Sequence, residues 1–296
     1  MSRFTGRGSL FAAAALALAV TVAAWFLPAR AVLALLAGAA AVVMVMVAES
    51  DRRVNARLQR LSLDARNDYR QVEALFSLFA SIRPELPLPD TRGWAASPDL
   101  LKLTADTVLD RRPGLVVEAS SGVSTLVIAY CLKRLGHGRV VSLEHDEKYL
   151  HLTRELIARH GLDSVATVVH APLRTTRIAG AEWPWYDVDA LRLDAPIDLL
   201  LIDGPPRRGH PLARYPALPL LFPRLADDAV VILDDGDREA ETETVRRWEA
   251  EFEHLSAHHL PLEKGAWLLR LSRPARDARP AAGARAGDEG RLAHRP

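Results

Sequence analysis

Short apolar segments alternate with helical segments from residue 115 to residue 271, and this alternation constrains the fold more than any other feature of the sequence. The predicted helices are 125–135, 147–160, 211–225 and 238–252. The predicted strands are 115–117, 139–143, 165–170, 197–202, 229–233, 253–260 and 266–271, and the last two are joined through Gly265. Continuous apolar strands separated by helices indicate an α/β domain with a mostly parallel sheet that is covered on both faces.

Carboxylates follow four of the first five predicted strands. They are Glu118, Glu144, Asp203 and Asp234. In open α/β sheets, ligands bind beyond the carboxyl ends of the strands, at the point where the strand order switches. A purely structural sheet has no need of acids at these positions, so we expect the functional site at this edge.

The turn from Glu118 to Ser124 links the first predicted strand to a helix. Its small residues let backbone N–H groups approach a ligand, and the helix N-terminus adds a positive field. We expect Ser124 to be the N-cap of that helix. Glu144 lies 22 residues after Gly122, at the end of the second strand, where an acid holds the hydroxyls of a ribose. The turn and this acid together predict a nucleotide-type cofactor.

With these features, residues 90–272 resemble a class I S-adenosylmethionine-dependent methyltransferase, whose Rossmann-like sheet also ends in an antiparallel hairpin. Glu118 and Gly122 match the acid and one glycine of that family's glycine-rich turn, whereas Ser120 and Ser124 replace two other glycines. The resemblance implies that S-adenosylmethionine is the cofactor. The cofactor-binding residues that it implies are Glu118, Ser120, Gly122, Ser124, Glu144 at the ribose, His145 and Pro172 at the adenine, and Asp203 at the methionine end or the substrate.

Asp203, Asp234 and Asp235 follow two neighbouring strands of the predicted sheet. This region resembles catechol-type O-methyltransferases, which bind a divalent cation with acids at comparable places. The resemblance implies a possible site for a cation such as Mg²⁺, a hard ion that prefers oxygen ligands. The alternative is that these acids act as a base or position other groups. The candidates for base or metal ligand are Asp203, Asp235 and His210.

A basic loop follows the fourth predicted strand. It contains Arg207, Arg208 and His210, with Arg214 and Tyr215 beyond it. Such a loop either grips an anionic substrate through its guanidinium groups or is simply solvated.

Two uncharged runs precede the domain, 10–27 and 31–48, separated by Pro28, Ala29 and Arg30. Each run is long enough, at about 1.5 Å per residue, to cross the hydrocarbon layer as a helix. We therefore predict a two-pass transmembrane hairpin over 1–48. The alternatives are a cleaved signal peptide, which leaves the second run unexplained, and a single helix broken at Pro28.

Arginines flank both runs on their outer sides. Arg3 and Arg7 precede the first run, and Arg52, Arg53, Arg57 and Arg60 follow the second, whereas only Arg30 lies between them. The Lys/Arg bias places both ends inside, so we predict a cell-membrane protein with a cytoplasmic domain.

The segments that flank the domain have their own signatures. Residues 49–89 carry apolar residues at helical spacing and end in a proline-rich stretch from Pro84, which predicts an amphipathic helical linker that docks on the domain. Residues 273–296 are rich in Ala, Arg, Pro, Gly and Asp and are predicted to be disordered.

Composition excludes several classes of function. The formal net charge is only +1, which gives no support for general nucleic-acid binding. The single cysteine excludes an internal disulfide and a cysteine-cluster metal site.

The hypothesis that follows is a membrane-anchored methyltransferase that transfers a methyl group to an oxygen of a small, lipid-linked or membrane-proximal acceptor. The alternative is a non-catalytic membrane scaffold or ligand-binding module that keeps the same fold. A nicotinamide dehydrogenase is a third hypothesis, disfavoured by the terminal hairpin and the glycine-poor turn.

Overall fold

The computed structural model describes residues 14–15, 17–19, 21–22, 28–206 and 210–273. Contacts within the chain divide it into two units, Met1–Tyr69 and Arg70–Pro296. The predicted disordered tail lies outside the described residues, apart from Arg273.

One long helix, α2 (Ala29–Ile82), begins directly after Pro28 and runs on into the second unit. It has no break between residues 48 and 49, where the predicted membrane segment meets the predicted linker. The helix contains no proline and only one glycine, Gly38, so nothing interrupts its i→i−4 hydrogen bonds. It ends two residues before Pro84, as the proline-rich stretch predicts.

Among the described residues, α2 is the one helix that is long and apolar enough to cross a membrane. Its most apolar stretch is 0% buried within the protein. The first of the two predicted membrane runs, 10–27, lies largely outside the described residues. One candidate span is therefore found where two were predicted, and the two-pass hairpin stays a prediction.

The last turns of α2 belong to the C-terminal unit and pack within it. Gln71, Ala74, Leu78 and Ile82 are buried there, at the three- and four-residue spacing of one helix face. A further helix, α3 (Pro98–Arg111), precedes the first strand and was not among the predicted elements.

Seven strands form one sheet with the order β3-β2-β1-β6-β7-β9-β8. The strands are β1 (Leu115–Ala119), β2 (Arg139–Glu144), β3 (Ala166–His170), β6 (Ile197–Ile202), β7 (Leu225–Asp234), β8 (Leu255–Leu260) and β9 (Ala266–Leu271). All neighbouring pairs are parallel except the two that involve β9. The predicted seven-stranded, mostly parallel sheet with an antiparallel last hairpin is thus confirmed.

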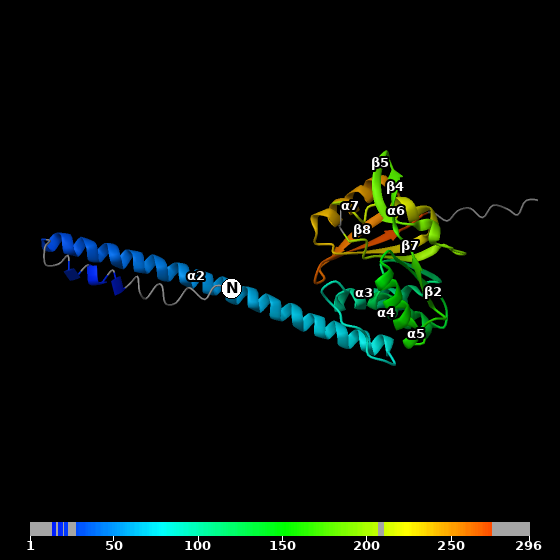
Figure 1. Cartoon of the computed structure of the whole chain (residues 1–296), viewed down its shortest axis with the longest axis horizontal. Helices are drawn as coiled ribbons and strands as arrows, with labels where there is room; N and C mark the ends of the chain where they lie inside the picture. The colour runs from blue at the N-terminus through cyan, green and yellow to red at the C-terminus, as the bar shows by residue number, and fades with distance from the viewer. Residues whose placement is uncertain (1–13, 16, 20, 23–27, 207–209, 274–296) are drawn as a thin grey trace, which may run out of the picture. The chain divides into compact units, whose positions relative to one another are not determined.

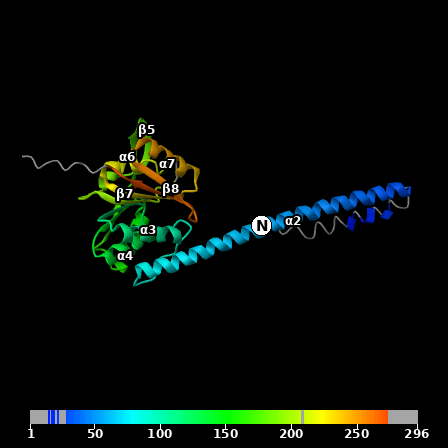
Figure 2. The same cartoon turned by 180° about the vertical axis from the view of Figure 1, so that it is seen from behind.

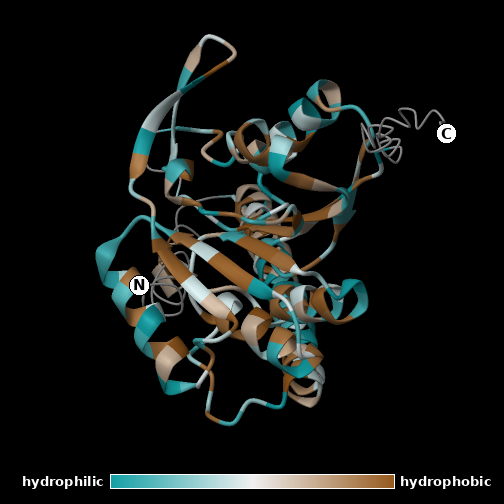
Figure 3. Ribbon diagram, turned by 90° about the vertical axis from the view of Figure 1, so that its right-hand side faces the viewer, coloured by the Kyte–Doolittle hydropathy of each residue, from teal (hydrophilic) through white to brown (hydrophobic). Residues whose placement is uncertain are grey.

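Helices cover both faces of the sheet (Figures 1 and 2). Alternate strand residues face opposite sides, so Val116 joins the cluster beneath α3, α4 (Val123–Leu135) and α5 (Glu147–Arg159), whereas Val117 joins the cluster on the other face. That second face packs against α6 (Ala217–Leu221) and α7 (Glu239–Glu251). The central strands are hydrophobic over most of their length (Figure 3), as a sheet buried on both faces requires.

Residues 211–225 were predicted as one helix, and this prediction was wrong. The segment contains a turn, the short helix α6 and a 3₁₀ helix, Phe222–Arg224. Pro211, Pro216, Pro219 and Pro223 each lack an N–H, so a continuous helix could not keep its ladder of hydrogen bonds.

A two-stranded antiparallel sheet, β4 (Leu173–Ile178) with β5 (Ala181–Tyr186), was also missed. This hairpin is inserted between β3 and β6 and stands away from the main sheet (Figure 1). The residues of β4 are largely exposed, and β5 contains Pro184, which cannot donate a ladder hydrogen bond. The hairpin therefore lacks the apolar pattern of an ordinary buried strand.

Candidate functional site

The order of the strands brings the predicted acids to one edge of the sheet. Strands β2, β1, β6 and β7 are consecutive neighbours, so Glu144, Glu118, Asp203 and Asp234 stand at adjacent carboxyl ends. The amide N–H of Asp203 donates to the carbonyl of Ala119 at 3.1 Å, which joins the ends of β6 and β1. The predicted gathering of carboxylates is therefore observed.

Glu118 is fully buried and is surrounded by hydroxyl groups. It accepts hydrogen bonds from Ser124, from Thr125 at 2.6 Å and from Ser142 at 2.6 Å. Burial raises the pKa of Glu118, and these hydroxyls oppose that shift. Ser142 is the direct partner of Glu118 in the β1–β2 register. Glu118 thus holds the turn in place through these three hydrogen bonds.

The start of α4 differs from the prediction. The N-cap is Gly122 rather than Ser124, and the helix begins at Val123. Gly122 has φ = +153°, which a side chain disfavours, and its N–H donates to the Thr125 hydroxyl at 3.1 Å. Because Ser124 lies inside the first turn, its hydroxyl reaches back to Glu118 instead of capping the helix.

Ser120 occupies a glycine-type backbone conformation, with φ = +133°. Its N–H donates to the carbonyl of Leu143 at 3.1 Å, which holds the turn against β2. Ser120 therefore replaces the family's glycine in sequence while keeping the backbone shape that glycine favours. The turn still leads into the N-terminus of α4, where the first-turn N–H groups have no acceptor within the helix.

Glu144 is nearly buried and faces this turn. The Ser121 hydroxyl donates to its Oε2 at 2.9 Å, while the N–H groups of His145 and Asp146 donate to its Oε1 at 2.8 and 2.9 Å. Burial by itself raises the pKa of Glu144, but the hydrogen bonds from His145, Asp146 and Ser121 lower its net pKa below the ordinary value. The Glu144 carboxylate is thus kept ionised at the carboxyl end of β2, as an acceptor of hydrogen bonds from hydroxyl groups.

The residues predicted for the adenine lie beside Glu144. His145 places Nδ1 3.1 Å from Glu144 Oε1. The neighbouring Ala171 donates its N–H to the carbonyl of Glu144 at 2.7 Å, and Pro172 accepts from the N–H of Asp187 at 3.1 Å. The first of these bonds joins the ends of the neighbouring strands β2 and β3, which His145 and Pro172 follow.

Tyr186 was not predicted as a site residue. It is buried at the end of β5, with its ring 5.7 Å from that of His145, measured between ring centres. Its hydroxyl lies so close to Gly204 that a β-carbon on the glycine would overlap it. Burial, together with the charges of Glu144 and Asp203, raises its pKa well above the ordinary value. The run Trp183-Pro184-Trp185-Tyr186 was the signal in the sequence that an inserted hairpin brings aromatic residues to the site.

His210 does not join the acids through any contact of the described residues. Its ring lies 4.2 Å from that of Trp183, and its Nδ1 accepts from the N–H of Leu212 at 3.2 Å. Trp183 and Trp185 are buried, whereas Trp94 is 90% exposed. The residues 207–209 of the basic loop lie outside the described residues.

Asp203, Asp234 and Asp235 do lie together, with one carboxylate oxygen of each within 4.8 Å of the others. Burial raises the pKa of Asp203 well above its ordinary value, and the charge of Asp234 raises it further. The pKa of Asp234 is raised by burial and by Asp235. The predicted trio is thus a real cluster of crowded acids.

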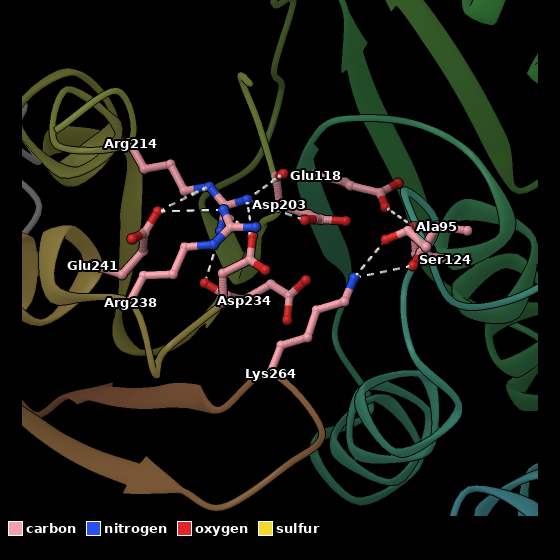
Figure 4. Close-up of polar contacts among 11 residues, drawn as sticks. Ala95, Glu118, Ser124, Asp203, Arg214, Asp234, Arg238, Glu241 and Lys264 are labelled. Atoms are coloured by element: carbon pink, nitrogen blue, oxygen red, sulfur yellow. Dashed lines mark hydrogen bonds and ion pairs between the residues drawn. The ribbon is translucent and has the colours of Figure 1, made fainter. Parts of the chain in front are cut away.

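A buried arginine fills this cluster. Arg214 donates to Asp235 Oδ2 at 2.6 Å, to the carbonyl of Asp234 at 2.7 Å and to the carbonyl of Asp203 at 2.8 Å. Arg238 approaches the same Asp235 oxygen at 2.7 Å. Figure 4 shows both guanidinium groups reaching into the acids. The sequence placed Arg214 just beyond a basic loop that either grips an anionic substrate or is solvated, but its side chain is 6% exposed and faces inward.

The cluster with its two arginines does not fit a divalent cation. A hard cation requires several free oxygen ligands and would lie against a buried positive charge. The oxygen of Asp235 that faces the cluster is already shared by Arg214 and Arg238.

A family model described as a methyltransferase domain matches residues 119–236. The domain has the class I methyltransferase fold. The match runs from the last residue of β1 to just beyond β7, so it includes Glu144 and the acid trio, although it covers less than half of the chain. A comparison with curated protein sequences finds no match.

Solved structures of methyltransferases are similar to this chain at low identity. An SAH complex of an O-methyltransferase from Bacillus cereus shares 19% identity, with a TM-score of 0.48, and the match covers 70% of this chain and 97% of that one. TomG from Streptomyces achromogenes, in complex with SAM, shares 19% identity, with a TM-score of 0.47 and coverage of 68% and 90%. SAH-bound PaMTH1 from Podospora anserina shares 16% identity, with a TM-score of 0.46 and coverage of 67% and 88%.

Proposed function

We propose that the chain is an S-adenosylmethionine-dependent O-methyltransferase that its N-terminal segment holds at a membrane. The observation that supports it best is Glu144, a buried and ionised carboxylate at the end of β2, linked through Ser121 to the turn that precedes α4. A ribose needs a carboxylate at this place in the fold, and the methionine end needs the neighbouring helix N-terminus.

The residues of the edge fit this cofactor. The turn at Ser120 and Gly122 has the backbone shape that allows close approach, and Glu118 holds that shape from behind. His145, Pro172 and Tyr186 supply a mixed polar and aromatic border next to Glu144. When bound, S-adenosylmethionine would supply an electrophilic methyl group on a positively charged sulfur, and the sulfur would leave with the electrons of its bond to that methyl group.

Asp203 is the group best suited to take the proton of the acceptor hydroxyl. Burial and the charge of Asp234 raise the pKa of Asp203, which makes its carboxylate a stronger base than that of an ordinary aspartate. Its place at the end of β6, between Ala119 and the acids of β7, faces the same edge as the turn. The protein's further contribution is to position the oxygen in line with the sulfur–methyl bond.

The membrane part of the proposal is supported by α2 and by the uncharged runs of the sequence. The predicted two-pass hairpin would keep the domain on the cytoplasmic side, where a lipid-linked or membrane-proximal acceptor would be within reach. The alternative acceptor is a small soluble compound that carries a hydroxyl group.

Calorimetric titration of S-adenosylmethionine into the full chain in detergent tests the cofactor. We expect binding by the wild type and at least a tenfold weaker Kd for Glu144→Ala. Glu147→Ala is the matched control, since Glu147 is an exposed acid three residues further on and should leave the Kd unchanged. Equal binding by wild type and Glu144→Ala would contradict the proposed site.

Transfer of a labelled methyl group then separates enzyme from scaffold. Incubation with membrane lipids and with a soluble hydroxyl-compound library should label one of the two fractions. Cofactor binding without any transfer would favour the non-catalytic scaffold.

A further inference from the structure

The acids beyond β6 and β7 already have a permanent counter-charge. Arg214 makes three hydrogen bonds shorter than 3 Å to this group and lies 3.3 Å from Asp203 Oδ1. Its Nε also lies 3.9 Å from Glu241. Burial alone lowers the pKa of Arg214, but Asp203, Asp235 and Asp234 outweigh this and raise it, so the guanidinium stays charged.

The segment that carries Arg214 is held rigidly. Tyr215 donates its hydroxyl to Glu251 on α7 at 2.7 Å, and the Trp248 indole donates to the carbonyl of Tyr215 at 2.9 Å. Arg214 is therefore fixed from both sides, by its own hydrogen bonds and by its anchored neighbour.

The place that a dication would need among the acids is already occupied by guanidinium groups. Four carboxylates, those of Asp203, Asp234, Asp235 and Glu241, surround two guanidinium groups. A metal ion would have to displace Arg214, whose buried charge would then lose its partners.

We propose that Arg214 replaces a metal ion in this domain as the fixed counter-charge of Asp203, Asp234 and Asp235, so that cofactor binding and methyl transfer need no divalent cation. Arg214 is a positioning residue: it fixes the carboxylates of Asp203 and Asp235 and ties the ends of β6 and β7 together. The part that concerns methyl transfer rests on the proposed function, whereas the exclusion of metal from the acid trio does not.

Binding of Mn²⁺, measured by electron paramagnetic resonance on the full chain in detergent, tests the exclusion directly. At 1 mM Mn²⁺, exposed carboxylates bind the ion weakly, so we expect the wild type and Asp235→Ala to bind the same amount. Arg214→Ala should open the trio and gain a site, and Arg214→Ala combined with Asp235→Ala should lose it again. Arg214→Lys keeps a positive charge and should bind no more Mn²⁺ than the wild type. Binding of Mn²⁺ by the wild type at a site abolished by Asp235→Ala would overturn the proposal, as would a folded Arg214→Ala that binds no more than the wild type.

Wild-type measurements decide the matter if Arg214→Ala does not fold. The Kd for S-adenosylmethionine and the rate of methyl transfer should each agree within twofold in 5 mM EDTA and in 5 mM Mg²⁺. Loss of cofactor binding or of transfer in EDTA, restored by Mg²⁺, would overturn the proposal. Absence of cofactor binding under both conditions would instead count against the proposed function, and the Mn²⁺ result would still stand.

Discussion

Gln71 and Asp99 join the end of α2 to the start of α3 by a reciprocal pair of hydrogen bonds. Gln71 donates from Nε2 to Asp99 Oδ2 at 2.8 Å, and the N–H of Asp99 donates to Gln71 Oε1 at 3.1 Å. Asp99 also accepts from the Ser97 hydroxyl at 2.6 Å and from the N–H of Glu263, in the β8–β9 turn, at 2.7 Å. One buried carboxylate thus joins three distant parts of the domain.

Asp99→Ala should therefore destabilise the domain by about 3 kcal/mol, because it leaves several buried donors without an acceptor. Chemical denaturation followed by tryptophan fluorescence would measure the change. Asp110→Ala, which removes an exposed acid from the same helix, should change the stability by less than about 0.5 kcal/mol. Equal effects of the two variants would refute this role of Asp99.

Truncation should separate the two roles of α2. Deleting residues 1–69 removes the apolar part and should move the protein from the membrane fraction to the soluble fraction without lowering the Tm of the domain. Deleting residues 1–82 also removes Leu78 and Ile82, which are 1% and 3% exposed. This second deletion should cost at least about 3 kcal/mol, as for the loss of two core side chains. Membrane fractionation and thermal unfolding check both expectations.

Ser120→Gly should stabilise the domain although it removes a side chain. The strain of a non-glycine residue at φ = +133° is of order 1–3 kcal/mol, and the greater freedom of glycine in the unfolded chain offsets about 0.5–1 kcal/mol of the relief. We expect a net gain of about 1 kcal/mol, read as a rise in Tm. Ser120→Ala keeps the strain and should show no such rise.

Asp203→Asn should change how stability depends on pH. The folded pKa of Asp203 is raised by burial and by Asp234, so the folded chain holds this proton to a higher pH than the unfolded chain. This contribution is complete below the unfolded pKa and is lost as the pH rises from there through the folded pKa, by about 1.4 kcal/mol for each pH unit in that window.

Asparagine mimics the protonated form, so the variant should gain on the wild type as the pH increases. Unfolding free energies at a series of pH values give the difference. Asp194→Asn is a control of opposite sign, since Arg139 lowers the pKa of that exposed carboxyl. A difference between Asp203→Asn and wild type that is constant with pH would contradict the raised pKa.

The sequence predicted the parts of the fold that depend on continuous apolar runs. Strands such as 197–202 are apolar at nearly every position because both faces of the sheet are covered, so their ends, and the acids beyond them, could be located. The hairpin of β4 and β5 lies outside that sheet, and its polar residues carry no such pattern. Tyr186 was missed together with its strand.

Arg214 was misjudged for a different reason. In the sequence it stands beside Arg207, Arg208 and His210, which suggests an exposed basic loop. Its partners are Asp203, 11 residues before it, and Asp234 and Asp235, 20 and 21 residues after it. Only the pairing of β6 with β7 brings these residues to one point. Local composition predicts the charge of such a residue but not its burial.

The hydroxyl groups around Glu118 have a consequence for how this turn can change. One buried carboxylate accepts hydrogen bonds from Ser124, Thr125 and Ser142. The loss of one hydroxyl therefore changes how much the other two contribute to stability. The effects of substitutions at these three positions on stability should be strongly non-additive. Glu118 and its three partners are therefore expected to be inherited together. A descendant of this chain could exchange these four residues as a whole more easily than it could lose them one at a time.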